Sequence, residues 1–305
     1  MTRRVLVTGG AGFIGSHVVE ALLRAGDDVH ALDDLSKGQV TNLPAMVPLH
    51  VLDIRDAHVE RLLGDLRFDA VVHCAAQTNV MRSITEPDLD RQINIDGLQR
   101  TLDAAVAASV GRFVFISSGG AVYGETATPA GEETRAQPDN PYGEHKLRGE
   151  EMVTVSKVPG VTLRPSNVYG RRQRSDAEGG VIAIFAERLA AGQRLQIYGD
   201  GEQRRDFVHV SDVVDAVALA LDDLSMGGVW NVGTGRATTV NEVAETMITA
   251  FRAGSVIEHL PPRGEIRRSC LDVSKLIATD RWRPRMDLAQ GVADLARSAI
   301  VRKPS

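Results

Sequence analysis

The sequence predicts an α/β protein built on a doubly wound parallel sheet, with a smaller region toward the C-terminus. Short apolar runs alternate with helical segments from residue 5 to residue 118, and this alternation with short connections is typical of parallel sheets. The first apolar run also leads directly into a glycine-rich turn. Beyond about residue 165 the alternation becomes irregular. We therefore expect a first domain over residues 1–165, to which 204–235 returns, and a second region over residues 166–305.

The composition is that of a globular protein and narrows the classes of function. The chain has 305 residues, of which 43% are hydrophobic and 25% charged, enough for a large core and one or two domains. The formal net charge of -5 argues against nucleic-acid binding, which needs a concentrated basic surface. We expect no signal peptide, and no apolar run approaches the roughly 18 residues of a membrane span. We expect a cytoplasmic protein with neither nucleic-acid nor membrane partners.

Cysteine and metal-ligand patterns exclude two further classes. The sequence contains only Cys74 and Cys270, so it predicts neither a disulfide framework nor a cysteine-based metal site. No spaced set of histidines, cysteines and carboxylates indicates another metal site. We expect no metal.

The glycine-rich turn follows the first predicted strand, and residues 5–15 read Val-Leu-Val-Thr-Gly-Gly-Ala-Gly-Phe-Ile-Gly. Gly10, Gly12 and Gly15 match the pattern of dinucleotide-binding Rossmann folds, and Gly9, Gly12 and Gly15 match a related three-residue spacing. Small residues here let the backbone approach a pyrophosphate closely. The phosphates are then stabilised at the positive N-terminus of the next helix. The turn therefore predicts a dinucleotide site.

Two carboxylates end the second predicted strand and indicate which dinucleotide binds. Asp33 lies 18 residues after Gly15 and is followed by Asp34. A carboxylate near this distance can accept hydrogen bonds from both ribose hydroxyls of NAD and would repel the 2′-phosphate of NADP. Lys37 lies close enough to tolerate a phosphate, but the acid pair favours NAD.

Further strand ends supply polar or small residues on the same edge of the sheet. The predicted strands span residues 29–33, 49–53, 68–74 and 112–118, and the predicted helices span 17–25, 56–63 and 88–108. Ligands of doubly wound sheets lie beyond the carboxyl ends of the strands. The glycine turn, Asp33, the small residues Ala75 and Ala76, and the serines Ser117 and Ser118 should therefore meet at this edge.

A tyrosine and a lysine four residues apart supply the candidate catalytic pair. Asn140 is a good N-cap and Pro141 a good first helical residue, so Tyr142 and Lys146 should share one face of a helix. Tyrosine, with a pKa near 10, is a poor base at neutral pH. A neighbouring ammonium stabilises the phenolate and lowers that pKa. Tyr142 could then accept a proton from a substrate hydroxyl as hydride leaves the same carbon.

These motifs together resemble the extended short-chain dehydrogenase/reductase family, in particular nucleotide-sugar epimerases of the UDP-glucose 4-epimerase type. The resemblance runs nearly end to end. It includes Thr8-Gly-Gly-Ala-Gly-Phe-Ile-Gly15, Asp53-Ile54, His73-Cys-Ala-Ala-Gln77, Asn94, Ser117-Ser-Gly-Gly-Ala-Val-Tyr-Gly124, Tyr142 with Lys146, Arg164-Pro-Ser-Asn-Val-Tyr-Gly170, Tyr198-Gly-Asp-Gly201, Arg205-Asp-Phe-Val-His-Val210 and Asn231-Val-Gly-Thr-Gly235. These motifs are far more specific for the family than for the sugar.

The resemblance implies three sets of site residues. The catalytic set is Tyr142, Lys146 and a serine, either Ser118 or Ser117. The NAD-binding set is Gly9, Gly12, Phe13, Ile14, Gly15, Asp33, Asp34, Leu35, Ser36, Lys37, Gly38, Asp53, Ile54, Cys74, Ala75, Ala76, Gln77, Asn94, Tyr142 and Lys146. The substrate-binding set is Ser118, Tyr142, Asn167, Val181, Gln196, Tyr198, Arg205, Arg263 and Glu265.

The substrate set implies how a nucleotide sugar would be gripped. Predicted helix 179–191 precedes a strand at residues 195–198, which in the family lies along the uracil. Arg205 and Arg263 would hold the diphosphate, for which a rigid fork of donors is well suited. Asn167 would contact a phosphate, and Glu265 would accept the uridine ribose hydroxyls. By the resemblance, the long helix near residue 88 and the Tyr142 helix would form a homodimer interface.

One position departs from the family pattern. A serine or threonine usually stands three residues before Val-Tyr-Gly, where this chain has Gly119, so a neighbouring serine or water would supply the hydroxyl. Dehydratases of the family carry an Asp-Glu pair where this chain has Gly120 and Ala121, and decarboxylases usually carry Glu at the position of Ala121. The resemblance therefore favours 4-epimerisation of UDP-glucose and UDP-galactose through a 4-keto sugar over water loss or decarboxylation.

Alternatives remain open at this point. Arg171, Arg172 and Arg174 form a basic cluster that could be solvated or could sense a sugar carboxylate, which keeps UDP-glucuronate open. A dTDP-sugar is a further candidate, and a catalytically idle NAD-binding protein is another, favoured only by Gly119. We interpret His73 and His209 as structural.

Overall fold

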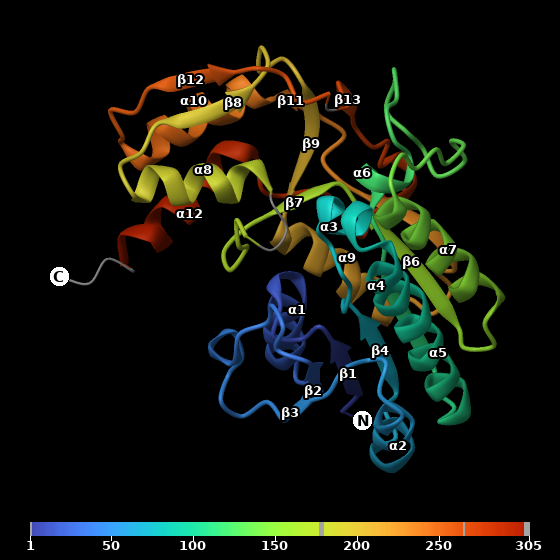
Figure 1. The fold of residues 1–305 in the computed structure, drawn as a ribbon. Coiled ribbons are helices and arrows are strands. Elements are labelled where there is room, and N and C mark those ends of the chain that lie inside the picture. The colour runs from blue at the N-terminus through green and yellow to red at the C-terminus, as the bar shows by residue number, and fades with distance from the viewer. Residues whose placement is uncertain (1, 177–179, 265, 302–305) are drawn as a thin grey trace. The chain divides into compact units, whose positions relative to one another are not determined.

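The computed structural model describes residues 2–176, 180–264 and 266–301, which form two compact units (Figure 1). The first unit contains residues up to Val122, Pro138–Arg164 and Val214–Trp230, and the second contains Tyr123–Gln137, Pro165–Val213 and the residues from Asn231 onward. The returning segment is therefore shorter than the predicted 204–235. In addition, residues 123–137 belong to the second unit rather than to the first domain.

The first unit is organised by a seven-stranded sheet, which confirms the predicted fold class. Its strand order is β10-β6-β5-β4-β1-β2-β3. The strands are β1 (Arg4–Thr8), β2 (Asp28–Asp33), β3 (Leu49–Val51), β4 (Ala70–His73), β5 (Arg112–Ile116), β6 (Gly160–Pro165) and β10 (Gly228–Val232). The pairs from β3 through β6 are parallel. The order reverses between β1 and β4, which is where doubly wound sheets bind their ligands.

Helices connect these strands. They are α1 (Phe13–Ala25), α2 (His58–Leu66), α3 (Val80–Thr85), α4 (Pro87–Arg91), η2 (Gln92–Gly97), α5 (Leu98–Ala107), α6 (Gly119–Val122), α7 (Pro141–Val155) and α9 (Val210–Asp222), with a short 3-10 turn η1 (Val40–Asn42). The predicted helix 88–108 is therefore three segments, because η2 is a π-helix. Helix α1 ends at Gly26, whose left-handed φ of 91° suits glycine.

The core of the first unit explains why these elements pack. Leu6, Val71, Leu98, Phe113 and Phe115 are at most 2% exposed and belong to one buried cluster. Burying one such side chain contributes about 1.5–3 kcal/mol. Strands β1, β4 and β5 are fully buried apart from Arg4, as expected for parallel strands covered on both faces.

The second unit is built around shorter strands with its own core. Its sheets contain β7 (Asn167–Tyr169), β9 (Arg204–His209), β11 (Ala237–Thr239) and β13 (Arg268–Ser269), and the pair β8 (Leu195–Tyr198) with β12 (Ile257–Leu260). Its further helices are α8 (Val181–Ala190), α10 (Val240–Phe251), α11 (Ser274–Ile277) and α12 (Leu288–Val301). Phe185, Leu195, Ile197 and Met247 are buried in the core cluster of this unit. The predicted strand 195–198 is confirmed as β8.

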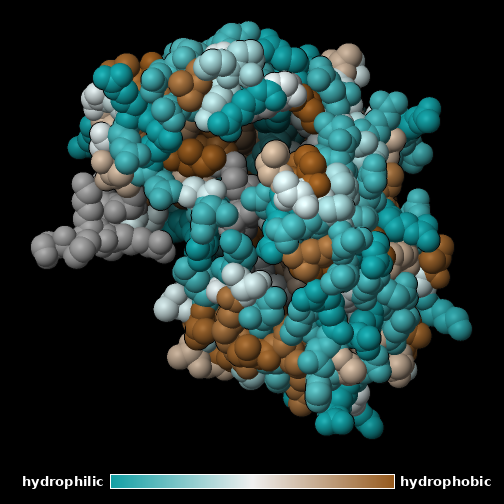
Figure 2. Space-filling model, in the orientation of Figure 1, coloured by the Kyte–Doolittle hydropathy of each residue, from teal (hydrophilic) through white to brown (hydrophobic). Residues whose placement is uncertain are grey.

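Apolar residues are exposed in parts of the face drawn in Figure 2. Figure 2 shows a mainly hydrophilic face, with apolar atoms gathered where α1 and β2 lie. After β2, Val40 and Met46 are 56% and 79% exposed. None of the helices within the described residues is long and apolar enough to cross a membrane.

Candidate active site

The glycine turn after β1 forms a close-fitting backbone cradle at the reversal point of the sheet. Gly9 has a left-handed φ of 65°, and a Cβ built there would lie 2.7 Å from the backbone nitrogen of Ala75. A Cβ on Gly15 would collide with the carbonyl oxygen of Gly9. Gly12 caps α1 without a side chain, and the first turn of α1 contains no acidic residue. The N-terminus of α1 therefore remains positive and open to an anion such as a pyrophosphate.

Asp33 ends β2 beside this cradle and stabilises it. Its carboxylate accepts hydrogen bonds from the backbone nitrogens of Ala11 and Leu35, both at 2.9 Å. Burial raises the pKa of Asp33. Gly38 lies directly against the carboxylate, since a Cβ there would lie 2.5 Å from Oδ1. A carboxylate has about four lone-pair sites, so Asp33 can hold the turn and still accept a ribose hydroxyl.

The other residues near Asp33 that are predicted to bind the cofactor differ in their surroundings. Asp34 is exposed and accepts hydrogen bonds from the backbone nitrogen and hydroxyl of Ser36. Asp53 is bound to Arg55 through contacts of 2.5–3.0 Å, and the Arg55 guanidinium lowers the pKa of Asp53. Ile54 is 5% exposed. Asp53 is thus largely engaged by Arg55, whereas Asp34 and Lys37 are exposed to solvent.

The loop after β4 is held by a buried amide. Asn94, in η2, accepts a hydrogen bond from the backbone nitrogen of Gln77 at 3.0 Å and donates to the Gln77 carbonyl oxygen at 2.9 Å. Ala75 and Ala76 are partly exposed. Burial raises the pKa of the Cys74 thiol to about 12. This thiol therefore stays neutral in the loop at residues 74–79, which is the candidate cofactor loop.

Tyr142 and Lys146 lie on one face of α7, as predicted. The side chain of Asn140 accepts a hydrogen bond from Gly143 at 3.0 Å and caps the helix. Tyr142 is 9% exposed and Lys146 only 4%. Lys146 Nζ lies 5.9 Å from the centre of the Tyr142 ring and donates to the carbonyl oxygen of Ile116 at 2.9 Å. Burial lowers the pKa of Lys146 to about 8.

The two candidate serines have different environments. The Ser117 hydroxyl donates to Glu150 Oε1 at 2.5 Å, and Glu150 forms a buried ion pair with Arg164. Ser118 is partly exposed and directly precedes α6, which begins at the buried Gly119. The geometry favours Ser118 as the accessible hydroxyl and gives Ser117 a structural bond.

The candidate substrate residues belong to the second unit. Tyr198 ends β8 and accepts a hydrogen bond from Arg263 at 2.5 Å; the guanidinium carbon lies 3.4 Å from the centre of the Tyr198 ring. Gln196 is bonded to Arg188 and Glu258. The structure thus brings Tyr198 and Arg263 together.

Three other predicted substrate residues lie elsewhere in this unit. The Asn167 side chain donates a hydrogen bond to the carbonyl oxygen of Asp206 at 3.2 Å. The Arg205 side chain donates one to the carbonyl oxygen of Arg204. Val181 begins α8 and is partly buried. Glu265 lies outside the described residues.

The basic cluster near residue 171 is largely engaged by acids. Arg171 forms a bidentate pair with Asp294 at 2.7 Å, and Arg174 forms one with Asp176 at 2.7–2.8 Å. These pairs reduce the positive charge available to a sugar carboxylate.

The two histidines have structural surroundings. His73 is 2% exposed, hydrogen-bonds to Thr8 at 3.0 Å, and has its pKa lowered to about 3 by burial. His209 packs edge-to-face against Tyr169 and hydrogen-bonds to Ser211. The described residues contain no group of three or more His, Cys, Asp or Glu that could hold a metal ion.

Three titratable residues close to the candidate catalytic pair were missed in the sequence analysis. Glu150 lies four residues after Lys146, Asp90 lies four residues before Asn94, and His145 directly precedes Lys146. The four-residue spacing places each acid on the same helix face as a predicted site residue. That spacing could have indicated that Glu150 and Asp90 lie near predicted site residues, but it does not show that the two carboxylates are buried.

Comparisons with known proteins agree with this geometry. Residues 5–233 match the model of the NAD dependent epimerase/dehydratase family. The chain is 40% identical to UDP-glucose 4-epimerase of Mycolicibacterium smegmatis, over 95% of this chain and 96% of that protein. It is 35% identical to dTDP-glucose 4,6-dehydratase of Streptomyces niveus, over 95% and 91% of the two chains. The structure of Thermus thermophilus UDP-glucose 4-epimerase in complex with NAD matches with a TM-score of 0.93 and 40% identity, covering 98% of this chain and 100% of that one.

Proposed function

This chain belongs to the NAD dependent epimerase/dehydratase family, and we propose that it is an isomerase: an NAD-dependent 4-epimerase of a nucleotide sugar that interconverts UDP-glucose and UDP-galactose. The observation that carries the proposal is the buried Tyr142–Lys146 pair on α7 beside the end of β5. The 40% identity to named UDP-glucose 4-epimerases over nearly the full length supports this choice of substrate.

The residues of the first unit fit NAD. A Cβ on Gly9 would collide with the backbone of Cys74 and Ala75, and a Cβ on Gly15 would collide with the backbone of Gly9. The N-terminus of α1 would hold the pyrophosphate. Asp33 would accept the adenosine ribose hydroxyls and would repel a 2′-phosphate. NAD held by these residues would supply reversible hydride-transfer chemistry at the sugar carbon.

Residues of the protein would accept and return the proton of the sugar hydroxyl. Tyr142 would take the proton of the C4 hydroxyl and later return it, so that the sugar passes through a 4-keto form. The Lys146 ammonium lies 5.9 Å from the centre of the Tyr142 ring and favours the phenolate. Ser118 would hold the same hydroxyl. Arg205 and Arg263 would grip the diphosphate while the sugar turns.

Other activities of this family are less favoured. Gly120 and Ala121 lie in α6 where dehydratases and decarboxylases of the family carry acids, so an acid for water loss is missing from this segment. UDP-glucuronate and dTDP-sugars remain the alternative substrates. An idle NAD-binding protein is disfavoured because the Tyr142–Lys146 pair is present. We further propose a cytoplasmic homodimer whose interface includes α5 and α7.

The substrate is tested by proton NMR of the anomeric region. The NAD-loaded protein would be incubated separately with UDP-glucose and UDP-glucuronate. We expect a galacto-configured product from UDP-glucose. If only UDP-glucuronate gave a product, the substrate would be reassigned to UDP-glucuronate. If neither UDP-sugar gave a product, both UDP-glucose and UDP-glucuronate would be overturned as substrates.

The base is tested by Tyr142→Phe. We expect the variant to lose about 10²–10⁴-fold in kcat while it retains NAD, as measured by the cofactor released on denaturation. The exposed Arg148→Ala on the same helix is the matched control. Near-normal kcat in Tyr142→Phe would show that another group takes the proton.

A further inference from the structure

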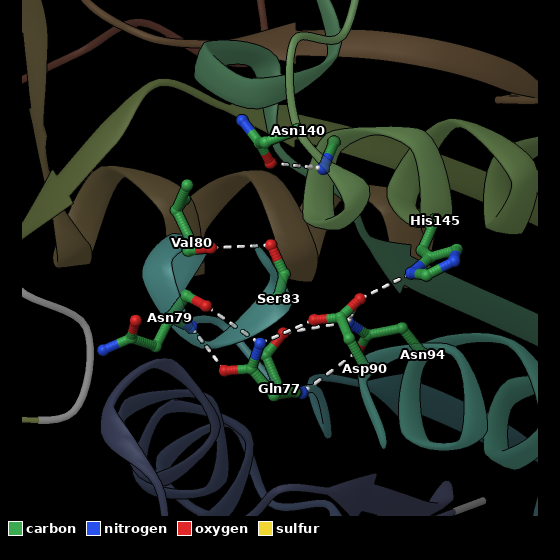
Figure 3. Close-up of polar contacts among 9 residues, drawn as sticks. Gln77, Asn79, Val80, Ser83, Asp90, Asn94, Asn140 and His145 are labelled. Atoms are coloured by element: carbon green, nitrogen blue, oxygen red, sulfur yellow. Dashed lines mark hydrogen bonds and ion pairs between the residues drawn. The ribbon is translucent and has the colours of Figure 1, made fainter. Parts of the chain in front are cut away.

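A buried polar network connects the catalytic helix to the cofactor loop. Figure 3 shows Gln77, Asp90, Asn94 and His145 turned toward one another. The side chain of Asp90 is completely buried and that of His145 is 18% exposed. His145 Nδ1 lies 2.6 Å from Asp90 Oδ2. Because a carboxylate only accepts, the imidazole donates in this bond.

Asp90 also holds the other partners of the network. Its Oδ1 accepts from Gln77 Nε2 at 2.6 Å, and its Oδ2 accepts from Asn94 Nδ2 at 3.1 Å. Gln77 Oε1 in turn accepts from the backbone nitrogen of Asn79 at 2.6 Å. Each of these side-chain partners of Asp90 is therefore a donor, and the loop 74–79 is fixed by the same carboxylate as α7.

The hydrogen-bonded network lies next to both the candidate base Tyr142 and the candidate cofactor loop. His145 is the residue before Lys146 and three residues after Tyr142, and α7 packs against α3, α4 and η2. Asn94 lies in the π-helix η2, and π-helical turns are frequent at functional sites. Loop residue Ala75 touches the glycine turn. One buried cluster thus fixes the candidate base and the cofactor cradle relative to each other.

We propose that Asp90 and His145 are a positioning pair that sets the Tyr142–Lys146 face of α7 against the cofactor loop. The inference rests on the proposed function, because it assumes that Tyr142 is the base. The bond from His145 sets the position of α7. The Asp90 charge additionally stabilises the nearby Lys146 ammonium.

The Asp90 charge acts on a lysine that has several titratable neighbours. The titratable groups that face Lys146 are Cys74 and His73 at the end of β4, Asp90 in α4, and Tyr142 and Glu150 on α7. Burial lowers the pKa of Lys146 to about 8, and the negative charge of Asp90 opposes this shift. Lys146 is charged below that pH and loses its proton as the pH rises through it. Removing the Asp90 charge should therefore move the alkaline limb of activity to lower pH.

Three variants of the NAD-loaded protein separate the effect of the His145–Asp90 hydrogen bond from the effect of the Asp90 charge. We expect His145→Ala to lower kcat about tenfold, the effect of an imperfectly placed base, with KM for UDP-glucose within about twofold. His145→Asn should recover most of the loss, since its amide nitrogen can replace Nδ1 as donor to Asp90. Asp90→Asn should lower kcat and also move the alkaline limb down by about half a pH unit.

The outcomes distinguish this inference from the proposed function. Wild-type kcat in His145→Ala, or no recovery in His145→Asn, would overturn the positioning pair even where Tyr142→Phe is inactive. Activity in Tyr142→Phe would instead overturn the base itself. If Asp90→Asn fails to fold, the comparison of His145→Ala with His145→Asn still decides.

Discussion

The surroundings of α7 and of β8–β12 hold their candidate functional side chains in opposite ways. Around α7, Lys146, Asp90, Asn94 and Glu150 are at most 4% exposed. Asn94 donates to Asp90, Lys146 donates to the carbonyl oxygen of Ile116, and Glu150 pairs with Arg164. At β8–β12, Arg263 contacts Tyr198 at the surface, and Arg267 pairs with Asp200 while both side chains are more than half exposed. Buried networks are rigid because each partner is costly to lose, whereas exposed pairs contribute little.

This difference separates two functional requirements. Hydride and proton transfer depend on placement within fractions of an ångström, which the fold of the first unit sets before a ligand arrives. Binding a diphosphate needs positive charge and a long side chain, which the exposed Arg263 would supply. Substitutions in the first region should therefore affect stability or kcat, and those in the second should affect KM.

The largest effect on stability is expected at Glu150. Glu150→Ala would leave the buried Arg164 guanidinium without the carboxylate that contacts it at 2.5–3.1 Å. Breaking a buried pair in this way costs about 3–5 kcal/mol. Thermal unfolding followed by circular dichroism should show a melting temperature lowered by roughly 10 °C.

The matched control is Glu151→Ala, which removes an exposed partner of Arg148. We expect its unfolding free energy to change by less than about 1 kcal/mol. Equal melting temperatures for the two variants would contradict the claim that buried pairs dominate this region.

An intermediate effect is expected at Arg263. If its guanidinium grips the diphosphate, Arg263→Ala should raise KM for UDP-glucose about 10–100-fold, because hydrogen bonds to charged groups contribute about 1.5–3 kcal/mol. Steady-state kinetics should show kcat within a few-fold of wild type, since the arginine would bind ground and transition states equally. Arg267→Ala is the control, with KM nearly unchanged. A large loss of kcat in Arg263→Ala would mean that this region also sets the chemistry.

The sequence was informative where local patterns coincide with function. The glycine turn, Asp33 and the Tyr142–Lys146 spacing are local signals, and the structure places them on the first unit as predicted. Other features depend on contacts between segments far apart in the chain. Asp90 meets His145 across 55 residues, and the engagement of Ser117 by Glu150 spans 33.

Local periodicity also hides changes in helix type. The segment 88–108 reads as one helix because its apolar spacing is nearly regular, yet η2 widens to a π-helix between α4 and α5. Asn94, predicted as a cofactor contact, uses its amide inside this turn to hold Gln77. That partnership requires the tertiary arrangement of β4 and η2, which spacing alone does not encode.

The smallest effect is expected at Arg171, which also tests the choice of sugar. Its side chain is 48% exposed and pairs with Asp294, and exposed pairs are worth about 0.2–1 kcal/mol. Arg171→Ala should therefore leave kcat and KM for UDP-glucose within about twofold of wild type, with Arg174→Ala behaving alike. If Arg171→Ala instead abolished turnover of UDP-glucuronate alone, the arginine would be reading a sugar carboxylate. The second unit would then set sugar specificity through an arginine cluster whose ion pairs break when the ligand binds. The exposed ion pairs of the second unit would differ from the buried network around α7 because they depend on the ligand, and not because they are weak.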